Sequence, residues 1–207
     1  MKLFAHLLGL MVVLGSLTAE EIPEPYASTN DLPFDGHGWF MNGDYIAATM
    51  SLYNPVIAIE VGAWLGSSTR FIAERLPAGG KLYAIDTWRG SPNEPLHLRD
   101  PRMPYLYQLF LSNVKHANLT NVIIPVRMES LEASKAMNVQ ADFIYIDASH
   151  DETNVYNDIL AWYPHVKEGG VMCGDDWGWV SVQRGVIRAA NHLGKTVWGH
   201  GNFWRFL

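Results

Sequence analysis

Short apolar runs of strand length alternate along this chain with longer segments whose apolar residues recur at helical spacing. The strand-like runs cover residues 56–61, 81–86, 122–126, 143–146 and 171–173, and the helix-like segments cover residues 42–52, 67–76, 105–117, 132–137, 151–162 and 180–193. This alternation predicts parallel strands joined by crossover helices. Two last apolar segments, residues 195–199 and 202–207, flank a Gly-His-Gly turn and predict an antiparallel pair. We therefore expect an α/β fold with a doubly wound, seven-stranded, mostly parallel sheet and a C-terminal antiparallel hairpin.

The N-terminal region has a different composition. Residues 1–19 begin with Met1-Lys2, continue as an apolar run and end in small residues with a candidate cleavage point after Ala19. This layout is typical of a signal peptide, and it is short for a membrane span. Residues 20–38 are rich in Pro, Asp, Glu and Gly and predict a linker, so one domain is expected over residues 39–207. Export or membrane association and a cytoplasmic location both stay open.

Composition narrows the class of partner. The 207 residues suit one buried core, and the net charge of -6 with scattered Lys and Arg argues against a nucleic-acid-binding surface. A small molecule is the expected partner, with no stable membrane span in the mature domain and a homodimer left open. Cys173 is the only cysteine, so no intrachain disulfide can form, and its apolar neighbours predict a buried thiol.

The first strand leads into a glycine-bearing turn. Glu60 lies near the strand end, residues 62–66 form the turn, and Ser67 or Ser68 is placed to cap the following helix. About twenty residues further along, the second strand ends at Asp86, where a carboxylate can accept hydrogen bonds from ribose hydroxyls. Together these features indicate an adenosine-type ligand. The turn lacks the spacing of dinucleotide and triphosphate sites, which disfavours an NAD-dependent oxidoreductase.

A second constellation lies in residues 142–176. Asp147 and His150 follow one apolar run, and Asp175 and Asp176 follow the next, with one helix between them. Parallel strands joined in this way place these side chains in one crevice at the carboxyl edge of the sheet. Three carboxylates suit a hard cation such as Mg²⁺, which could lower the pKa of a substrate hydroxyl, and His150 could accept the proton. An aspartate pair can also cap a helix, and His150 could instead orient Asp147 or cap the next helix.

These motifs resemble a known family. The chain is similar to class I S-adenosylmethionine-dependent methyltransferases from about residue 40 to its end, in IEVGAWLGSSTRFIA and YAIDTW. IDTWRGSP, MESLEAS, the long segment from IDASH to GDDW, and SVQRGV are similar to methyltransferase family 24, a group related to macrocin-type sugar O-methyltransferases. The resemblance implies a Rossmann-like methyltransferase fold.

The resemblance also assigns site residues. It implies cofactor contacts by residues of the glycine turn, the second strand end and the third strand end: Glu60, Gly62, Ala63, Gly66, Ser67, Asp86, Thr87, Trp88, Glu129, Ser130 and Asp147. It implies that Asp147, Asp175 and Asp176 bind the metal and that His150, with Asp147, is catalytic. The chain lacks the N-terminal extension and auxiliary domain of the macrolide enzymes, so their substrate is not transferred.

We therefore expect an S-adenosylmethionine-dependent O-methyltransferase that acts on a saccharide or polyol with Mg²⁺ assistance. The alternatives are a metal-independent small-molecule methyltransferase and a non-catalytic, exported S-adenosylmethionine-binding protein. The unpatterned, proline-rich residues 87–104 predict a lid or binding loop. Trp88, Trp177 and Trp179 follow predicted strand ends, where they are candidates for an aromatic acceptor platform or for rim packing.

Overall fold

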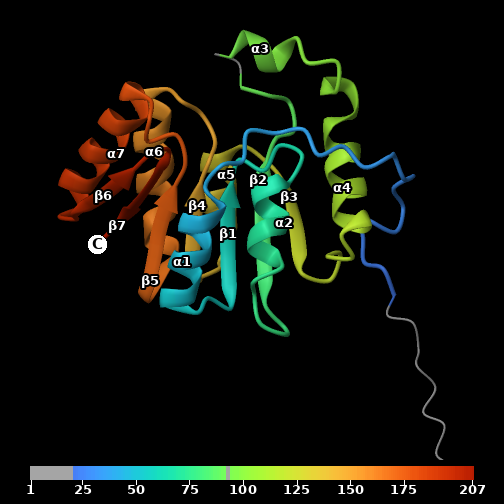
Figure 1. Cartoon of the computed structure of the whole chain (residues 1–207), viewed down its shortest axis with the longest axis horizontal. Helices are drawn as coiled ribbons and strands as arrows, with labels where there is room; N and C mark the ends of the chain where they lie inside the picture. Colours follow the sequence, from blue (N-terminus) through green and yellow to red (C-terminus); the bar gives the residue numbers. More distant parts are fainter. Residues whose placement is uncertain (1–20, 92–93) are drawn as a thin grey trace, which may run out of the picture.

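The computed structural model describes residues 21–91 and 94–207, and its centre is one seven-stranded sheet (Figure 1). The strands are β1 (Ile57–Val61), β2 (Lys81–Asp86), β3 (Ile123–Arg127), β4 (Ala141–Ile146), β5 (Val166–Gly174), β6 (Val197–His200) and β7 (Phe203–Phe206). Their order is β3-β2-β1-β4-β5-β7-β6. Strands β1 to β5 pair in parallel, and β7 pairs antiparallel with both β5 and β6. The predicted sheet and hairpin are confirmed.

Helices cover both faces of the sheet. Helices α1 (Gly43–Tyr53), α2 (Ser67–Ala73) and α4 (Leu106–His116) pack on one face, and α5 (Ser130–Ala136), α6 (Glu152–Trp162) and α7 (Val180–Leu193) pack on the other. The short elements are α3 (Pro95–Leu98), η1 (Met103–Tyr105) and η2 (Tyr163–His165). Alternating residues of a strand point to opposite faces. Ala58 of β1 therefore packs in the core on the side of α1, α2 and α4, and Ile59 packs in the core on the side of α5, α6 and α7.

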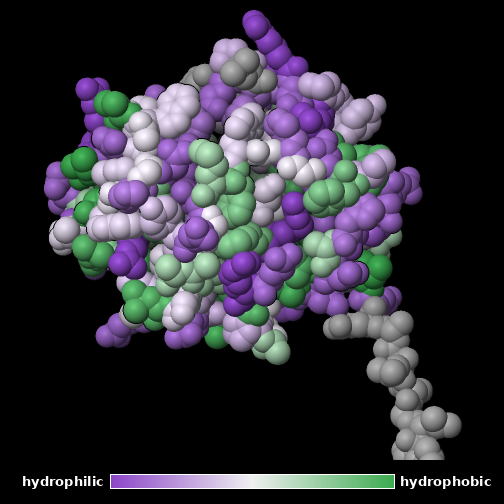
Figure 2. Space-filling view, in the orientation of Figure 1, coloured by the Kyte–Doolittle hydropathy of each residue, from purple (hydrophilic) through white to green (hydrophobic). Residues whose placement is uncertain are grey.

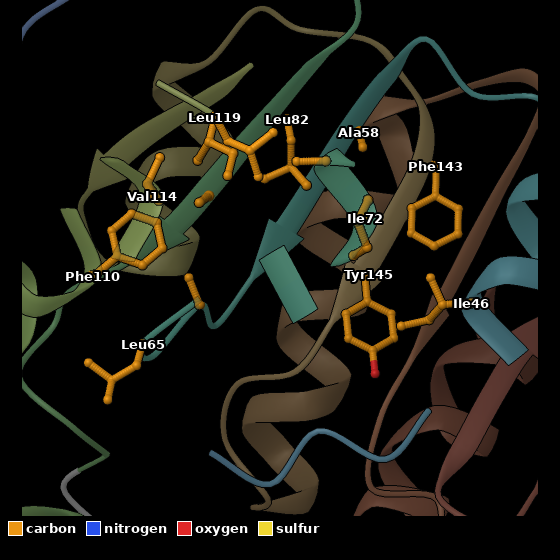
Figure 3. Close-up of a cluster of buried hydrophobic side chains, with 14 of the residues drawn as sticks. Ile46, Ala58, Leu65, Ile72, Leu82, Phe110, Val114, Leu119, Phe143 and Tyr145 are labelled. Carbon is orange, nitrogen blue, oxygen red and sulfur yellow. The ribbon is translucent and has the colours of Figure 1, made fainter. Parts of the chain in front are cut away.

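Tyr145 of β4 connects the core on the side of α1, α2 and α4 with the carboxyl ends of the strands. Its ring lies beside Ile46 and Phe143, and its hydroxyl points away from the apolar cluster (Figure 3). The hydroxyl donates a hydrogen bond to Asp175 Oδ2 at 3.2 Å. A buried tyrosine generally needs such a partner, and here the partner is a carboxylate at the end of the neighbouring strand.

Two local predictions are corrected. Neither Ser67 nor Ser68 caps α2, because the N-cap position is held by Gly66 with φ +80° and no side chain bonds the first amides. A Cβ at Gly66 would lie 3.0 Å from the Phe110 ring. The α6 helix is capped by Asp151, whose carboxylate accepts from the amides of Thr153 and Asn154, so His150 does not cap it.

The described part of the predicted linker packs against the domain. Tyr26 is buried and donates to the carbonyl of Ile123, and Asp35 is bonded to Asn113 and Arg102. The segment crosses from α4 past the upper strand ends to α1 (Figure 1), so residues 21–42 are part of the folded unit. The predicted signal segment, residues 1–19, lies outside the described residues.

The remaining fold-level predictions concern the cysteine and the surface. Cys173 is buried in β5, as predicted, and burial raises the pKa of its thiol. Over residues 21–91 and 94–207, no helix is long and apolar enough to cross a membrane. In the face shown in Figure 2, hydrophobic patches are separated by hydrophilic ones.

Candidate active site

The turn after β1 is held by Asp86 of the neighbouring strand. Asp86 Oδ2 accepts hydrogen bonds from the amides of Ala63 and Trp64, both at 2.9 Å, and Oδ1 accepts from the amide of Trp88 at 2.7 Å. Burial raises the pKa of Asp86, and these amides oppose that shift. Asp86, which the sequence predicts to bind the ribose, therefore also holds the turn in shape. A carboxylate has about four acceptor positions, so capacity for a further donor remains.

Gly62 brings this turn against the end of β4. Its φ is +93°, and a Cβ there would lie 1.8 Å from the carbonyl oxygen of Asp147. The two halves of the predicted site, separated by more than eighty residues in sequence, therefore touch through their backbones.

Replacing Gly62 by Ala is expected to lower the free energy of unfolding by about 3 kcal/mol or more, because a left-handed φ is combined with a backbone clash. Urea denaturation measures this. Gly79→Ala is the matched control, since Gly79 has φ +81° but open space around it. Its expected loss is only the roughly 1–2 kcal/mol of left-handed strain, and an equal loss in both variants would contradict the close contact.

Glu60 is a buried carboxylate that lacks a partner. It is fully buried in β1, and neither of its oxygens has a hydrogen bond of good geometry. Burial raises its pKa to about 7, although the nearby hydroxyls of Ser68 and Thr69 act to lower it. Buried polar groups are normally satisfied, so Glu60 indicates a missing cationic or hydrogen-bonding ligand beside the glycine turn.

Asp175, at the end of β5, is held by several donors. Its Oδ1 accepts from Asn42 Nδ2 at 2.7 Å and from the amide of Asp176 at 2.6 Å, and its Oδ2 accepts from the Tyr145 hydroxyl. Burial and the Asp176 carboxylate raise its pKa to about 6. Asp175 is therefore a fixed acceptor whose two oxygens are both in use.

Asp147, at the end of β4, lies with Asp175 and Asp176 around one small hollow, so the predicted convergence of the three carboxylates is observed. No hydrogen bond engages the Asp147 side chain among the described residues. Burial raises its pKa well above the ordinary value, and the carboxylates of Asp175 and Asp176 add to the shift. A carboxylate in this position is a stronger base than one in water.

His150 lies between two carboxylates. Its Nε2 is 2.7 Å from Asp176 Oδ2, and its Nδ1 is 3.1 Å from Glu94 Oε1. Asp176 and then Glu94 raise its pKa to about 10, against the effect of burial. Trp179 stacks on the ring, with centroids 4.8 Å apart and planes at 18°. In this arrangement His150 is an imidazolium at neutral pH, with Nε2 paired to Asp176 and Nδ1 within ion-pair distance of Glu94 Oε1, which has no hydrogen bond of good geometry.

The other predicted cofactor residues have varied environments. Ala63 and Ser67 lie in or directly after the turn, and the Thr87 hydroxyl accepts from the amide of Arg89. Trp88 points into the core, where it is 2% exposed and its indole donates to the carbonyl of Trp64. Glu129 is exposed at the start of α5, and the Ser130 hydroxyl is bonded to Asp158 and Trp162.

The predicted metal ligands do not form a ready metal site. Across the described ranges 21–91 and 94–207, no group of three or more His, Cys, Asp or Glu side chains is arranged to hold a metal ion. Asp175 already accepts three hydrogen bonds from neighbouring donors, and Asp176 is paired with His150. In this arrangement the three aspartates do not fit as a set of Mg²⁺ ligands.

Sequence reasoning did not identify three residues of this edge. Asn42 and Tyr145 position Asp175, and Glu94 joins His150 to His97, whose Nδ1 is 3.1 Å from Glu94 Oε2. Of these three residues, only Glu94 could have been identified from the sequence, because it lies in the predicted binding loop. A larger hollow lies between Lys115 and Asn121, remote from these residues, and contains none of the predicted side chains.

Comparisons with known proteins agree with this geometry. The family model described as a methyltransferase domain, Methyltransf_24, matches residues 59–177, which include both halves of the site. No curated protein matches the chain. The finer resemblance to macrocin-type sugar enzymes is not tested by these comparisons and stays a prediction.

Solved structures with the same fold include O-methyltransferases. One from Bacillus cereus, in complex with SAH, has 17% identity and a TM-score of 0.57, with 84% of each chain covered. One from Streptomyces achromogenes, involved in tomaymycin synthesis and in complex with SAM, has 15% identity and a TM-score of 0.61 over 80% of this chain and 78% of that one. At these identities the likeness establishes the fold. Since the family model covers more than half of the chain, the chain belongs to the methyltransferase domain family and has the class I fold of S-adenosylmethionine-dependent methyltransferases.

Proposed function

We propose that this protein is an S-adenosylmethionine-dependent O-methyltransferase that methylates a hydroxyl of a small molecule, a saccharide or another polyol. The observation that carries the proposal is the contact between the glycine turn of β1 and the carboxylate-bearing end of β4 through Gly62 and Asp147. A ligand bound at the turn is thereby next to a group that can accept a proton. The bound SAH and SAM of the Bacillus and Streptomyces enzymes support the identity of the cofactor.

The cofactor half is formed by β1, its turn and β2. The unpartnered carboxylate of Glu60 suits the ammonium group of a methionine moiety, and the spare acceptor capacity of Asp86 suits a ribose hydroxyl. In this proposal Gly62, Ala63, Gly66 and Ser67 provide the backbone around the methionine, and Glu129 and Ser130, at the start of α5, are assigned to the adenine as the family resemblance implies. When bound, S-adenosylmethionine supplies an electrophilic methyl group on a sulfonium centre.

The acceptor half is formed by the ends of β4 and β5. Transfer to an alcohol requires alignment and removal of the hydroxyl proton. We assign the acceptor role for that proton to Asp147, because no described side chain bonds to its carboxyl group and its backbone touches the glycine turn at Gly62. His150 balances the negative charge of Asp176 and Glu94. For His150 itself to act as the base, its Nδ1 must first lose the contact with Glu94.

Metal assistance is a separate question. Asp147, Asp175 and Asp176 would be the ligands, and the mutual repulsion that raises the pKa values of Asp147 and Asp175 is what a cation would relieve. Binding would require Asp176 to release His150. We therefore propose turnover that does not depend on Mg²⁺ in this arrangement.

The proposal is tested by calorimetry and by methyl transfer. Purified protein is titrated with S-adenosylhomocysteine, and transfer of a labelled methyl group is followed on a panel of glycosides and phenolics, in EDTA and in Mg²⁺. We expect binding and glycoside methylation under both conditions. Absence of S-adenosylhomocysteine binding contradicts the proposal. Binding without methyl transfer supports the non-catalytic alternative. Activity that is seen only with Mg²⁺ shows that the metal takes part in the reaction.

A further inference from the structure

Three aromatic rings from separate segments meet above the glycine turn. Trp39 comes from the N-terminal segment, Trp64 from the turn and His97 from α3. The ring centroids of Trp39 and His97 are 5.4 Å apart with planes at 27°, those of Trp64 and His97 are 5.0 Å apart, and those of Trp39 and Trp64 are 5.9 Å apart. The group lies at the edge of the sheet where the functional carboxylates also lie.

Trp39 is the exposed member of this group. It is 59% exposed, whereas Trp88 and Trp204 are at most 2% exposed. The backbone on both sides is anchored: Asp35 is bonded to Asn113 and Arg102, and Asn42 to Asp175. These anchors, together with stacking on His97, hold the indole in place although it remains accessible. An anchored indole with an accessible face offers a flat apolar surface to a ligand.

A chain of contacts connects these rings with the catalytic carboxylates. His97 pairs with Glu94, Glu94 with His150, and His150 with Asp176. On the cofactor side, the amide of Trp64 donates to Asp86. The rings therefore include a residue of the cofactor turn, Trp64, and are linked to the carboxylate group through Glu94 and His150. A ring-shaped acceptor bound beside Trp64 of the glycine turn would meet the exposed indole of Trp39, whose ring centroid is 5.9 Å from that of Trp64.

We infer that Trp39 is a specificity-determining residue that stacks against the ring of the acceptor. The inference rests on the proposed function, since it assumes that the acceptor binds between the glycine turn and Asp147. Of the predicted platform residues Trp88, Trp177 and Trp179, Trp88 lies in the core. Trp179 is 54% exposed and stacks on His150, so it and Trp177 stay candidates beside Trp39. The C–H groups on one face of a pyranose, or an aromatic ring, present the surface that an indole packs against.

The test uses saturation-transfer-difference NMR on full-length protein saturated with S-adenosylhomocysteine. The probes are the methyl glycosides of glucose, galactose, mannose and rhamnose, with catechol as the aromatic comparison. The variants are Trp39→Ala and Trp39→Phe. Trp198→Ala is the matched control, because Trp198 is also accessible, at 38%, but lies on β6 against Tyr45 and Arg205.

We expect ring-proton signals for at least one glycoside in the wild type, with a dissociation constant that rises about 10-fold in Trp39→Ala, falls back toward the wild type in Trp39→Phe and is unchanged in Trp198→Ala. The inference is overturned if the wild type gives no glycoside signals or if Trp39→Ala gives signals equal to those of the wild type. It is also overturned if catechol gives signals that do not depend on Trp39. The affinity for S-adenosylhomocysteine is measured on the same samples to separate the two claims. If the wild type binds S-adenosylhomocysteine, failure of the glycoside test removes only the role of Trp39. If the wild type does not bind it, both the proposed function and the role of Trp39 are removed.

Discussion

Replacement of Asp147 by Asn is expected to reduce the rate of methyl transfer by about 10²- to 10⁴-fold, the usual contribution of a positioned proton acceptor. The amide has nearly the shape of the carboxylate but cannot take a proton. Because no described side chain bonds to Asp147 and its pKa is raised by burial and by two neighbouring carboxylates, the substitution removes a base without breaking a structural contact. Transfer of labelled methyl to the acceptor found in the glycoside screen measures the rate.

Asp142→Asn is the control for this experiment. Asp142 lies in the same strand at its opposite end, where it accepts from the amides of Val56 and Ile57 and pairs with Lys167. Its substitution is expected to lower thermal stability and to leave the rate per folded molecule unchanged. Asp147→Asn should show the reverse pattern, with stability equal to or above the wild type. A rate unaffected by Asp147→Asn removes this residue from the proton-transfer step.

His150→Gln distinguishes the two candidate bases in the same assay. If Asp147 accepts the proton, loss of the imidazolium leaves Glu94 and Asp176 without their shared cation, and the expected loss of rate is smaller than in Asp147→Asn. A loss at least as large in His150→Gln would transfer the base role to the histidine, as the resemblance implies.

The strands and most helices could be predicted because their apolar periodicity is local. The residues of β2 and α7 coincide with the predicted segments, and the convergence of Asp147, Asp175 and Asp176 follows from parallel strands joined by one helix. These predictions need only the apolar pattern along the chain and the right-handed crossover between parallel strands. The family match over residues 59–177 is consistent with them.

Side-chain partners could not be predicted, since they depend on which segments meet in space. Residues 21–42 have a linker-like composition, yet Asn42 binds Asp175 and Trp39 stacks on His97. Trp88 follows a strand end, but its φ of +52° accompanies an indole that points into the core. The pairing of Glu94 with His150 joins residues 56 positions apart and has no local pattern.

The second large effect concerns Glu60. With a folded-state pKa of about 7 against an ordinary value of 4.5, the folded protein binds more protons than the unfolded chain between these pH values. The free energy of unfolding of the ligand-free protein should therefore fall as the pH rises from about 4.5 to 7, by roughly 3 kcal/mol from this group. Glu60→Gln should flatten this decline, which urea denaturation across the pH range measures.

Cofactor binding should reverse the protonation of Glu60. An ammonium group placed beside the carboxylate favours its ionised form, so binding of S-adenosylhomocysteine should release about 0.9 proton near pH 6 and about 0.1 near pH 8, given a pKa of about 7. Calorimetry in buffers of different ionisation enthalpy counts these protons. Glu60→Gln should release none and should bind about 10- to 150-fold more weakly, the range for a lost charge-assisted hydrogen bond. Unchanged affinity with proton release intact would place the ammonium group elsewhere and leave Glu60 as a buried structural acid.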